Sequence, residues 1–248
     1  MAPTDQQAPV ARRIHWPELL ITWAVLTAVS VAGSLLLFPH VMPRAASSTM
    51  HLIILTVVVF SVTAAPVGSL VYATLFYGLR HWKHSSGDEP PPDGPPMRGN
   101  TPVIIVWIGI SCVIGTFLLI WGLAAMAADS ADAAHPALTV DVTGQQWLWT
   151  FHYPGTDVTT SQLVLPEGKT VTFDVTSLDV VHGFWIVQMG VKVDANPGQV
   201  TTVSVTPDKA GTFTVVCSEL CGLNHAFMRA PVRVLPDNQF KSWLASQE

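Results

Sequence analysis

Three long apolar runs limit what the N-terminal half of this chain can become. They extend over residues 19–38, 52–80 and 102–128. A helix needs about 20 predominantly apolar residues to cross the hydrocarbon core of a bilayer. The first run is longer than the apolar core of a signal peptide, so we expect it to stay as a membrane helix. The alternative is a cleavage site hidden in Met42–Ser48.

Composition agrees with a membrane protein. The 248 residues are 49% hydrophobic and only 12% charged, and the mean hydropathy is +0.40. The formal net charge of -5 argues against nucleic-acid binding and would suit a basic protein partner. Three cysteines are too few for a disulfide scaffold.

Cations flanking the apolar runs predict the orientation in the membrane. The loop at 85–101 is Pro-rich, which favours extended polyproline conformation. Positive charges cluster before the first run and around this loop, at Arg12, Arg13, Arg80, Lys83 and Arg98, whereas the short loop between the first two runs has only Arg44. The positive-inside rule therefore puts the tail at 1–18 and the Pro-rich loop in the cytoplasm, and the C-terminal region outside.

Beyond the third run the sequence alternates with a period of two. Val171, Phe173 and Val175 alternate with polar residues, as do Val203 and Val205, and Pro/Gly pairs mark turns between such segments. This pattern is typical of strands with one buried and one solvated face. We predict a Greek-key β-sandwich over residues 135–236. The tail at 237–248 is expected to form a short amphipathic helix.

One twelve-residue stretch carries metal-binding chemistry. It contains Cys217, Cys221, His225 and Met228, spaced Cys-x3-Cys-x3-His-x2-Met, and His182 lies upstream after a predicted strand. Thiolates, thioethers and imidazoles together are the ligands of electron-transfer copper sites. Two sulfurs could bridge two metal ions, each capped by one imidazole. Met228 and a backbone carbonyl in the turn at Glu219 would then be weak axial ligands.

The same residues allow other interpretations. The cysteines could form a disulfide, because the loop is expected outside the cell. A structural zinc site needs four protein ligands with no open position, and methionine is a poor zinc ligand. Met228 alone would more often fill a core. The complete pattern with an upstream histidine favours copper over these three.

The sandwich explains how distant ligands could meet. His182 follows the strand ending near Ser177, and Cys217 follows the strand at 212–216, so two strand ends at one pole would bring them together. Rigid strands beneath a short loop preorganise a metal site. Asp179 and Asn224 are candidates for orienting the two imidazoles, and either could equally be a turn residue.

The metal-binding stretch resembles the dinuclear copper A loop of subunit II of cytochrome c oxidase and related haem-copper oxygen reductases. The likeness includes Asp179–Phe184, Lys192–Gly198 and the aromatic run Gly144–Tyr153. It implies a cupredoxin-like domain with two copper ions held by His182, Cys217, the Glu219 carbonyl, Cys221, His225 and Met228. It further implies that the Glu219 carboxylate reaches a magnesium ion shared with subunit I, and that Trp147 accepts electrons from cytochrome c.

Two features depart from the family pattern. The family usually has two transmembrane helices in subunit II, whereas three apolar runs are present here. Mitochondrial-type members carry a glutamate at the entrance of a proton pathway where this chain has Ile104, so no proton-uptake residue is assigned. His182-Gly183-Phe184 is nearer to divergent prokaryotic oxidases, which implies a prokaryotic plasma membrane with the copper domain on its outer, periplasmic side.

The expected protein is thus a membrane-anchored all-β subunit of a cytochrome c oxidase. The resemblance implies that electrons pass from cytochrome c through copper A to haem in subunit I, where oxygen is reduced to water with proton translocation. The implied partners are subunits I and III, cytochrome c and membrane lipid, and this chain would hold no catalytic site of its own. Two alternatives remain: the copper A subunit of a nitric oxide reductase, and a membrane-tethered copper-delivery cupredoxin.

Overall fold

The computed structural model of this chain describes residues 14–81, 99–133 and 136–247. Most of the predicted N-terminal tail and most of the Pro-rich loop lie outside these ranges. Arg12, Arg13, Lys83 and Arg98 therefore also lie outside the described residues. The orientation inferred from these cations rests on the sequence alone.

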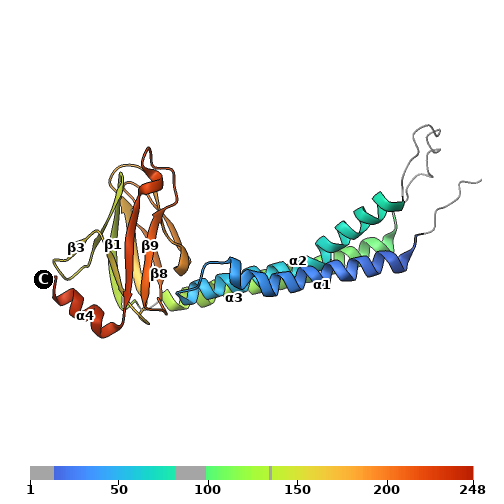
Figure 1. Cartoon of the computed structure of the whole chain (residues 1–248), viewed down its shortest axis with the longest axis horizontal. Coiled ribbons are helices and arrows are strands. Elements are labelled where there is room, and N and C mark those ends of the chain that lie inside the picture. The colour runs from blue at the N-terminus through green and yellow to red at the C-terminus, as the bar shows by residue number, and fades with distance from the viewer. Residues whose placement is uncertain (1–13, 82–98, 134–135, 248) are drawn as a thin grey trace, which may run out of the picture.

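Three helices precede the β-structure, in the order that the sequence predicts. They are α1 (Trp16–Val41), α2 (Ser48–His81) and α3 (Thr101–Ala133). Each contains a segment long and apolar enough to cross a membrane. The three helices extend from one end of the β-domain, and the short helix α4 (Asp237–Ala245) lies on the opposite side of that domain (Figure 1).

Polar contacts near the start of α1 join it to α2. The indole Nε1 of Trp23 donates a hydrogen bond to the Pro66 carbonyl at 2.8 Å. Nearer the cytoplasmic end predicted for these helices, Nε2 of His81 lies 3.0 Å from Oε2 of Glu18. Such contacts are favourable between membrane helices, where unpaired polar groups are costly. Helix α1 therefore packs as part of one helical unit with α2.

The β-domain consists of two five-stranded sheets. The first has the order β3-β2-β1-β5-β8 and the second the order β4-β10-β9-β6-β7. The strands are β1 (Leu138–Gln145), β2 (Leu148–His152), β3 (Thr159–Thr160), β4 (Leu163–Pro166), β5 (Val171–Ser177), β6 (His182–Ile186), β7 (Val191–Ala195), β8 (Thr201–Val205), β9 (Gly211–Cys217) and β10 (Arg229–Leu235). Strands β1 and β5 pair in parallel, as do β4 and β10. This sandwich confirms the predicted cupredoxin-like class.

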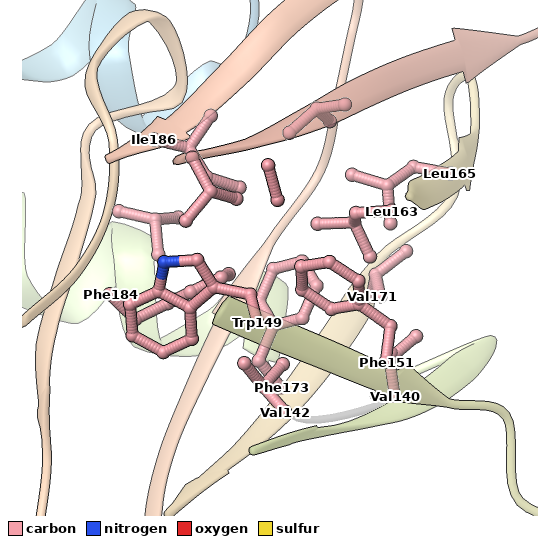
Figure 2. Close-up of a cluster of buried hydrophobic side chains, with 14 of the residues drawn as sticks. Val140, Val142, Trp149, Phe151, Leu163, Leu165, Val171, Phe173, Phe184 and Ile186 are labelled. Atoms are coloured by element: carbon pink, nitrogen blue, oxygen red, sulfur yellow. The ribbon is translucent and has the colours of Figure 1, made fainter. Parts of the chain in front are cut away.

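Alternating apolar residues build the core between the sheets. Strand β10 alternates exposed and buried positions through most of its length, as the period-two pattern requires. Trp149, Phe173 and Phe184 meet in the centre, and their contacts join the two sheets (Figure 2). The aromatic side chains of β2 are therefore core residues. At the far end, Trp243 of α4 packs edge-on against Tyr153, with ring centroids 5.4 Å apart.

The α1–α2 connection docks onto the β-domain. The Ser47 hydroxyl donates to the Met189 carbonyl at 2.7 Å and accepts from the Met50 N–H at 3.0 Å, so it caps α2 and binds the domain at once. The Ala46 N–H donates to the Gln188 carbonyl at 2.9 Å, and its carbonyl accepts from the Asp208 N–H at 3.1 Å. These bonds fix the β-domain relative to the start of α2.

Candidate metal centre

Pairing of β6 with β9 places the first two candidate ligands at one end of the second sheet. Phe184 lies opposite Cys217 in this antiparallel pair, so His182 and Cys217 come from neighbouring strand ends. The Ser218 N–H donates to the Gly183 carbonyl at 3.0 Å. A Cβ on Gly183 would lie 2.9 Å from the Glu219 nitrogen, so the loop after β9 passes directly over this glycine. Strand pairing thus brings together two residues 35 positions apart.

All six predicted ligand positions converge around the two sulfurs. Sγ of Cys217 lies 3.9 Å from Nδ1 of His182 and 3.2 Å from the Glu219 carbonyl oxygen. Sγ of Cys221 lies 3.6 Å from Nδ1 of His225 and 3.8 Å from Sδ of Met228. Each sulfur therefore has one imidazole beside it and one weaker donor.

The two cysteines are free thiols. Their sulfurs are 3.6 Å apart, and neither is in a disulfide. A disulfide bond would need about 2.0 Å between them. The geometry disagrees with the disulfide alternative and leaves both sulfurs available as ligands.

The donor set fits the copper chemistry that the fold family implies. His182 and Met228 are fully buried, and both cysteines are buried. The ligand atoms of His182, Cys217 and Cys221 all lie within 4.8 Å of one another, a grouping suited to a metal ion. Imidazole nitrogens, thiolates and a thioether in one buried cluster suit copper better than the hard cations that prefer oxygen.

Burial also affects the protonation of the thiols. Burial, followed by the neighbouring Cys217, raises the pKa of the Cys221 thiol to about 11. Without a metal this thiol is therefore neutral at physiological pH. Since thiolates are the metal ligands, metal binding at this site must release protons.

Asp179 orients the His182 ring. Its Oδ1 lies 2.8 Å from Nε2 of His182, which leaves Nδ1 on the side of the sulfurs. Burial opposes ionisation of this carboxyl, but hydrogen bonds from Gln146, His182 and Val180 outweigh it and lower its pKa to about 2. A carboxylate paired with a ligating imidazole is the usual partner at metal sites.

The other predicted residues have different surroundings. The Asn224 side chain is exposed, and its main-chain carbonyl accepts from the Phe227 N–H at 2.9 Å. That Asn224 orients one of the imidazoles stays a prediction. The Glu219 carboxylate faces outward, 3.8 Å from the Lys192 ammonium. Trp147 is half-buried at the tip of the β1–β2 hairpin, and a Cβ on Gly222 would lie 3.3 Å from its ring atom Cζ2.

Three features of the site were missed by sequence reasoning. Gln146 donates from Nε2 to the Cys221 carbonyl at 2.7 Å. Gly144 lies against the His182 ring, where a Cβ would come within 3.1 Å of Cδ2. Leu220, Leu223 and Phe227 project from the loop at 217–228, called the metal loop below, with exposed fractions of 84%, 91% and 81%. The contacts of Gln146 and Gly144 involve a hairpin that is distant in sequence, so no local pattern indicates them. The exposed apolar side chains could have been suspected only from the apolar residues within the loop itself.

Comparison with known proteins identifies the β-domain. Residues 156–235 match the family model described as cytochrome c oxidase subunit II, periplasmic domain. The β-domain is thus similar to the periplasmic domain of cytochrome c oxidase subunit II. The match covers the candidate ligands from His182 to Met228, and the predicted resemblance is therefore confirmed at the level of the family.

Several curated subunit II proteins are similar to this chain. Cytochrome c oxidase subunit 2 of Thermostichus vulcanus is 40% identical over 117 residues, which are 47% of this chain and 36% of that protein. The Synechocystis protein of that name is 27% identical, over 71% of this chain and 67% of its own length. The Alkalihalophilus pseudofirmus protein is 30% identical, over 74% and 55% respectively. The chain thus spans about a third to two thirds of these relatives.

A solved structure shares sequence with the domain. The periplasmic domain of subunit II of cytochrome oxidase from Bradyrhizobium japonicum is 34% identical and has a TM-score of 0.43. The alignment covers 46% of this chain and 94% of that one. A subunit II periplasmic domain, with apolar helices ahead of it, indicates a membrane-anchored protein whose β-domain lies on the outer side.

Proposed function

We propose that this chain is the electron-accepting subunit II of a cytochrome c oxidase and holds a dinuclear copper A centre. The observation that carries this proposal is the convergence of two free thiols, two imidazoles, a thioether and a carbonyl in one buried cluster. His182, Cys217, Cys221, His225 and Met228 would be the side-chain ligands, with the Glu219 carbonyl as the sixth donor. Copper held by these residues would supply one-electron transfer.

The protein contributes a prebuilt and mostly dry site. His182 is fixed by Asp179, and the sulfur of Cys221 is enclosed by Cys217, His225 and Met228. The two ligating strand ends belong to one hydrogen-bonded sheet, which restrains ligand motion. A rigid ligand set keeps the reorganisation accompanying electron transfer small.

Electrons are proposed to enter through Trp147. Its ring lies against the backbone of Gly222, the residue that follows Cys221. The exposed side chains of Leu220, Leu223 and Phe227 border the same loop, so apolar surface is available for a protein partner there. A soluble or tethered cytochrome c is the proposed electron donor.

The remaining roles concern the assembly. We propose that α1, α2 and α3 all cross a prokaryotic plasma membrane, that the chain binds subunit I and subunit III, and that electrons pass to haem in subunit I. Glu219 would supply its carboxylate to a magnesium ion at the subunit I interface. Oxygen reduction and proton translocation would belong to the complex, since no catalytic site is proposed within this chain.

Oxygen uptake by the intact complex tests this function. We expect a complex isolated through this chain to consume oxygen when supplied with reduced cytochrome c, and to lose that activity in a Cys217→Ser, Cys221→Ser double variant. Reduction of nitric oxide in place of oxygen would favour the reductase alternative. Readily exchanged copper(I), with neither gas reduced, would favour the copper-delivery alternative and contradict the proposal.

A further inference from the structure

The turn between β1 and β2 reaches both halves of the candidate metal centre. Gln146 lies in this two-residue turn, next to Trp147. Its main-chain N–H donates to Oδ2 of Asp179 at 2.8 Å, and the other oxygen of Asp179 binds the His182 ring. Its side-chain Nε2 donates to the Cys221 carbonyl at 2.7 Å. One residue therefore contacts both the carboxylate that orients the His182 ring and the peptide that follows Cys221.

The peptide that Gln146 holds has little restraint of its own. The Cys221 carbonyl belongs to the peptide linking Cys221 to Gly222, and Gly222 has a φ of +123°. Glycine has no Cβ to confine its backbone, so rotation of this peptide meets no steric barrier from its own side chain. The bond from Gln146 is the side-chain contact that fixes the carbonyl direction in the part of the chain that the structure describes.

The position of that peptide matters because Cys221 is the central ligand. Its sulfur lies 3.6 Å from the Cys217 sulfur, 3.6 Å from Nδ1 of His225 and 3.8 Å from Sδ of Met228. Rotation of the Cys221–Gly222 peptide would alter the backbone angles at Cys221 and carry its sulfur with them. Small ligand displacements change the sharing of an electron between two metals.

The side chains of Gln146 and Trp147 also pack against Gly222. A Cβ on Gly222 would lie 2.9 Å from Nε2 of Gln146 and 3.5 Å from Nε1 of Trp147. The hairpin tip is therefore packed against the metal loop without room for another carbon. The hydrogen bond to Cys221 ties the loop to the turn that carries the proposed electron acceptor.

We infer that Gln146 is a positioning residue for the dinuclear centre: it clamps the Cys221 peptide to the Trp147 turn and, through Asp179, keeps His182 aligned with the same turn. This inference rests on the proposed function, because the metal pair is the object that Gln146 positions. Gln146 itself touches no metal-ligand atom in the described contacts; it acts through the carbonyl and the carboxylate.

Two substitutions test whether the hydrogen bond from the Gln146 side chain to the Cys221 carbonyl matters, or only the presence of a polar side chain at this position. Gln146→Met keeps the length of the side chain but has no donor, and Gln146→Asn keeps the amide but is one methylene shorter. Gln145→Met is the matched control, because Gln145 is the adjacent exposed residue at the end of β1. All variants keep the main-chain N–H that reaches Asp179.

The test uses the full chain in detergent, loaded with copper, with three measurements on each variant. For both Gln146 variants we expect copper to be lost to a chelator about 2- to 10-fold faster than from wild type, the range for losing one hydrogen bond. We also expect an altered copper hyperfine pattern in the paramagnetic resonance spectrum. The thermal midpoint of the copper-free protein should fall no further than the loss of this one hydrogen bond requires, because Gln146 is otherwise exposed.

The outcomes distinguish the two proposals. If wild type binds two coppers normally and Gln146→Met matches Gln145→Met in copper loss and spectrum, Gln146 has no positioning role, while the proposed function stands. The positioning role is also contradicted if Gln146→Asn behaves like wild type while Gln146→Met does not. If wild type itself fails to hold a copper pair, the proposed function is overturned, and the role of Gln146 with it.

Discussion

Nε2 of His182 lies 2.8 Å from Oδ1 of Asp179, and Nδ1 of the same ring faces the sulfur of Cys217 at 3.9 Å. The carboxylate therefore selects which nitrogen faces the sulfurs of the candidate metal site. Asp179→Asn removes the negative charge and replaces one of the two carboxylate oxygens by an amide nitrogen. The donors from Gln146, Val180 and His182, which share two acceptor oxygens in the wild type, would then have one. We expect copper affinity to fall about 10- to 100-fold, the usual cost of losing such a partner.

Competition with a calibrated copper chelator measures this affinity. Asp174→Asn is the matched control, because Oδ1 of Asp174 accepts a 2.8 Å bond from Thr202 on the same domain but away from the metal loop. Equal affinities in the two variants would show that Asp179 does not support His182.

Gly222 allows the metal loop to approach the β1–β2 hairpin. Its φ of +123° is unfavourable for other residues, and an added Cβ would lie 2.9 Å from Nε2 of Gln146. Gly222→Ala should therefore destabilise the copper-free domain by about 1–3 kcal/mol and lower copper loading. Thermal unfolding and copper analysis measure the two effects.

Gly198→Ala separates backbone strain from crowding. Gly198 also has a positive φ, +72°, but nothing lies within 4 Å of its Cβ position. We expect this variant to lose some stability and to load copper normally. A normal copper content in Gly222→Ala would mean that the loop tolerates displacement at this point.

Tyr153 predicts a specific response to alkaline pH. Its hydroxyl donates to the Val164 carbonyl at 2.9 Å and accepts from the Val164 N–H at 2.8 Å. Burial raises the pKa of this phenol above its ordinary value. In the unfolded chain this tyrosine ionises near pH 10, whereas in the folded chain it stays protonated there. The stabilisation that comes from the buried, protonated phenol is therefore fully present below about pH 10 and is lost progressively as the pH rises above it.

Tyr153→Phe isolates that contribution. We expect it to lower the free energy of unfolding by about 1–3 kcal/mol near neutral pH, because both main-chain groups of Val164 lose a buried partner. The variant should then lose less stability than wild type between about pH 9 and pH 11, where the phenol titrates. Parallel curves of stability against pH for the two proteins would contradict the assignment.

Ser47 joins the start of α2 to the β-domain. Ser47→Ala removes the bond to the Met189 carbonyl and the cap on the Met50 N–H. We expect a loss of about 0.5–2 kcal/mol, as for other helix caps, with faster amide exchange confined to residues near 46–51 and 187–190. Ser61→Ala is the control, because that hydroxyl donates to the Val57 carbonyl within α2. Unchanged exchange at the junction would show that Ser47 does not hold it.

The sequence was most informative where the chemistry is local. Four of the five proposed side-chain ligands lie within twelve residues, and their types and spacing, together with an upstream histidine, predicted a copper loop. Strand ends meeting at one pole explained how His182 could join them. The three long apolar helices and the period-two strands were likewise visible, because each depends on the polarity of nearby residues.

Contacts between distant segments could not be predicted in this way. Gln146 and Cys221 are 75 positions apart, and only the packing of the hairpin tip on the metal loop shows that they meet. Helix α2 begins at Ser48, earlier than the apolar run at 52, because Ser47 caps it while docked on Met189. Such capping depends on a partner 142 residues away, which no local pattern indicates.

Counting copper in the purified full-length chain tests the central claim most directly. The chain is reconstituted with copper, its metal content is determined per polypeptide, and its paramagnetic resonance spectrum is recorded. The account predicts two coppers per chain and a mixed-valence spectrum with the unpaired electron shared by both ions. A single copper with an ordinary one-metal spectrum, or Cys217 joined to Cys221 in a disulfide with no copper bound, would contradict it.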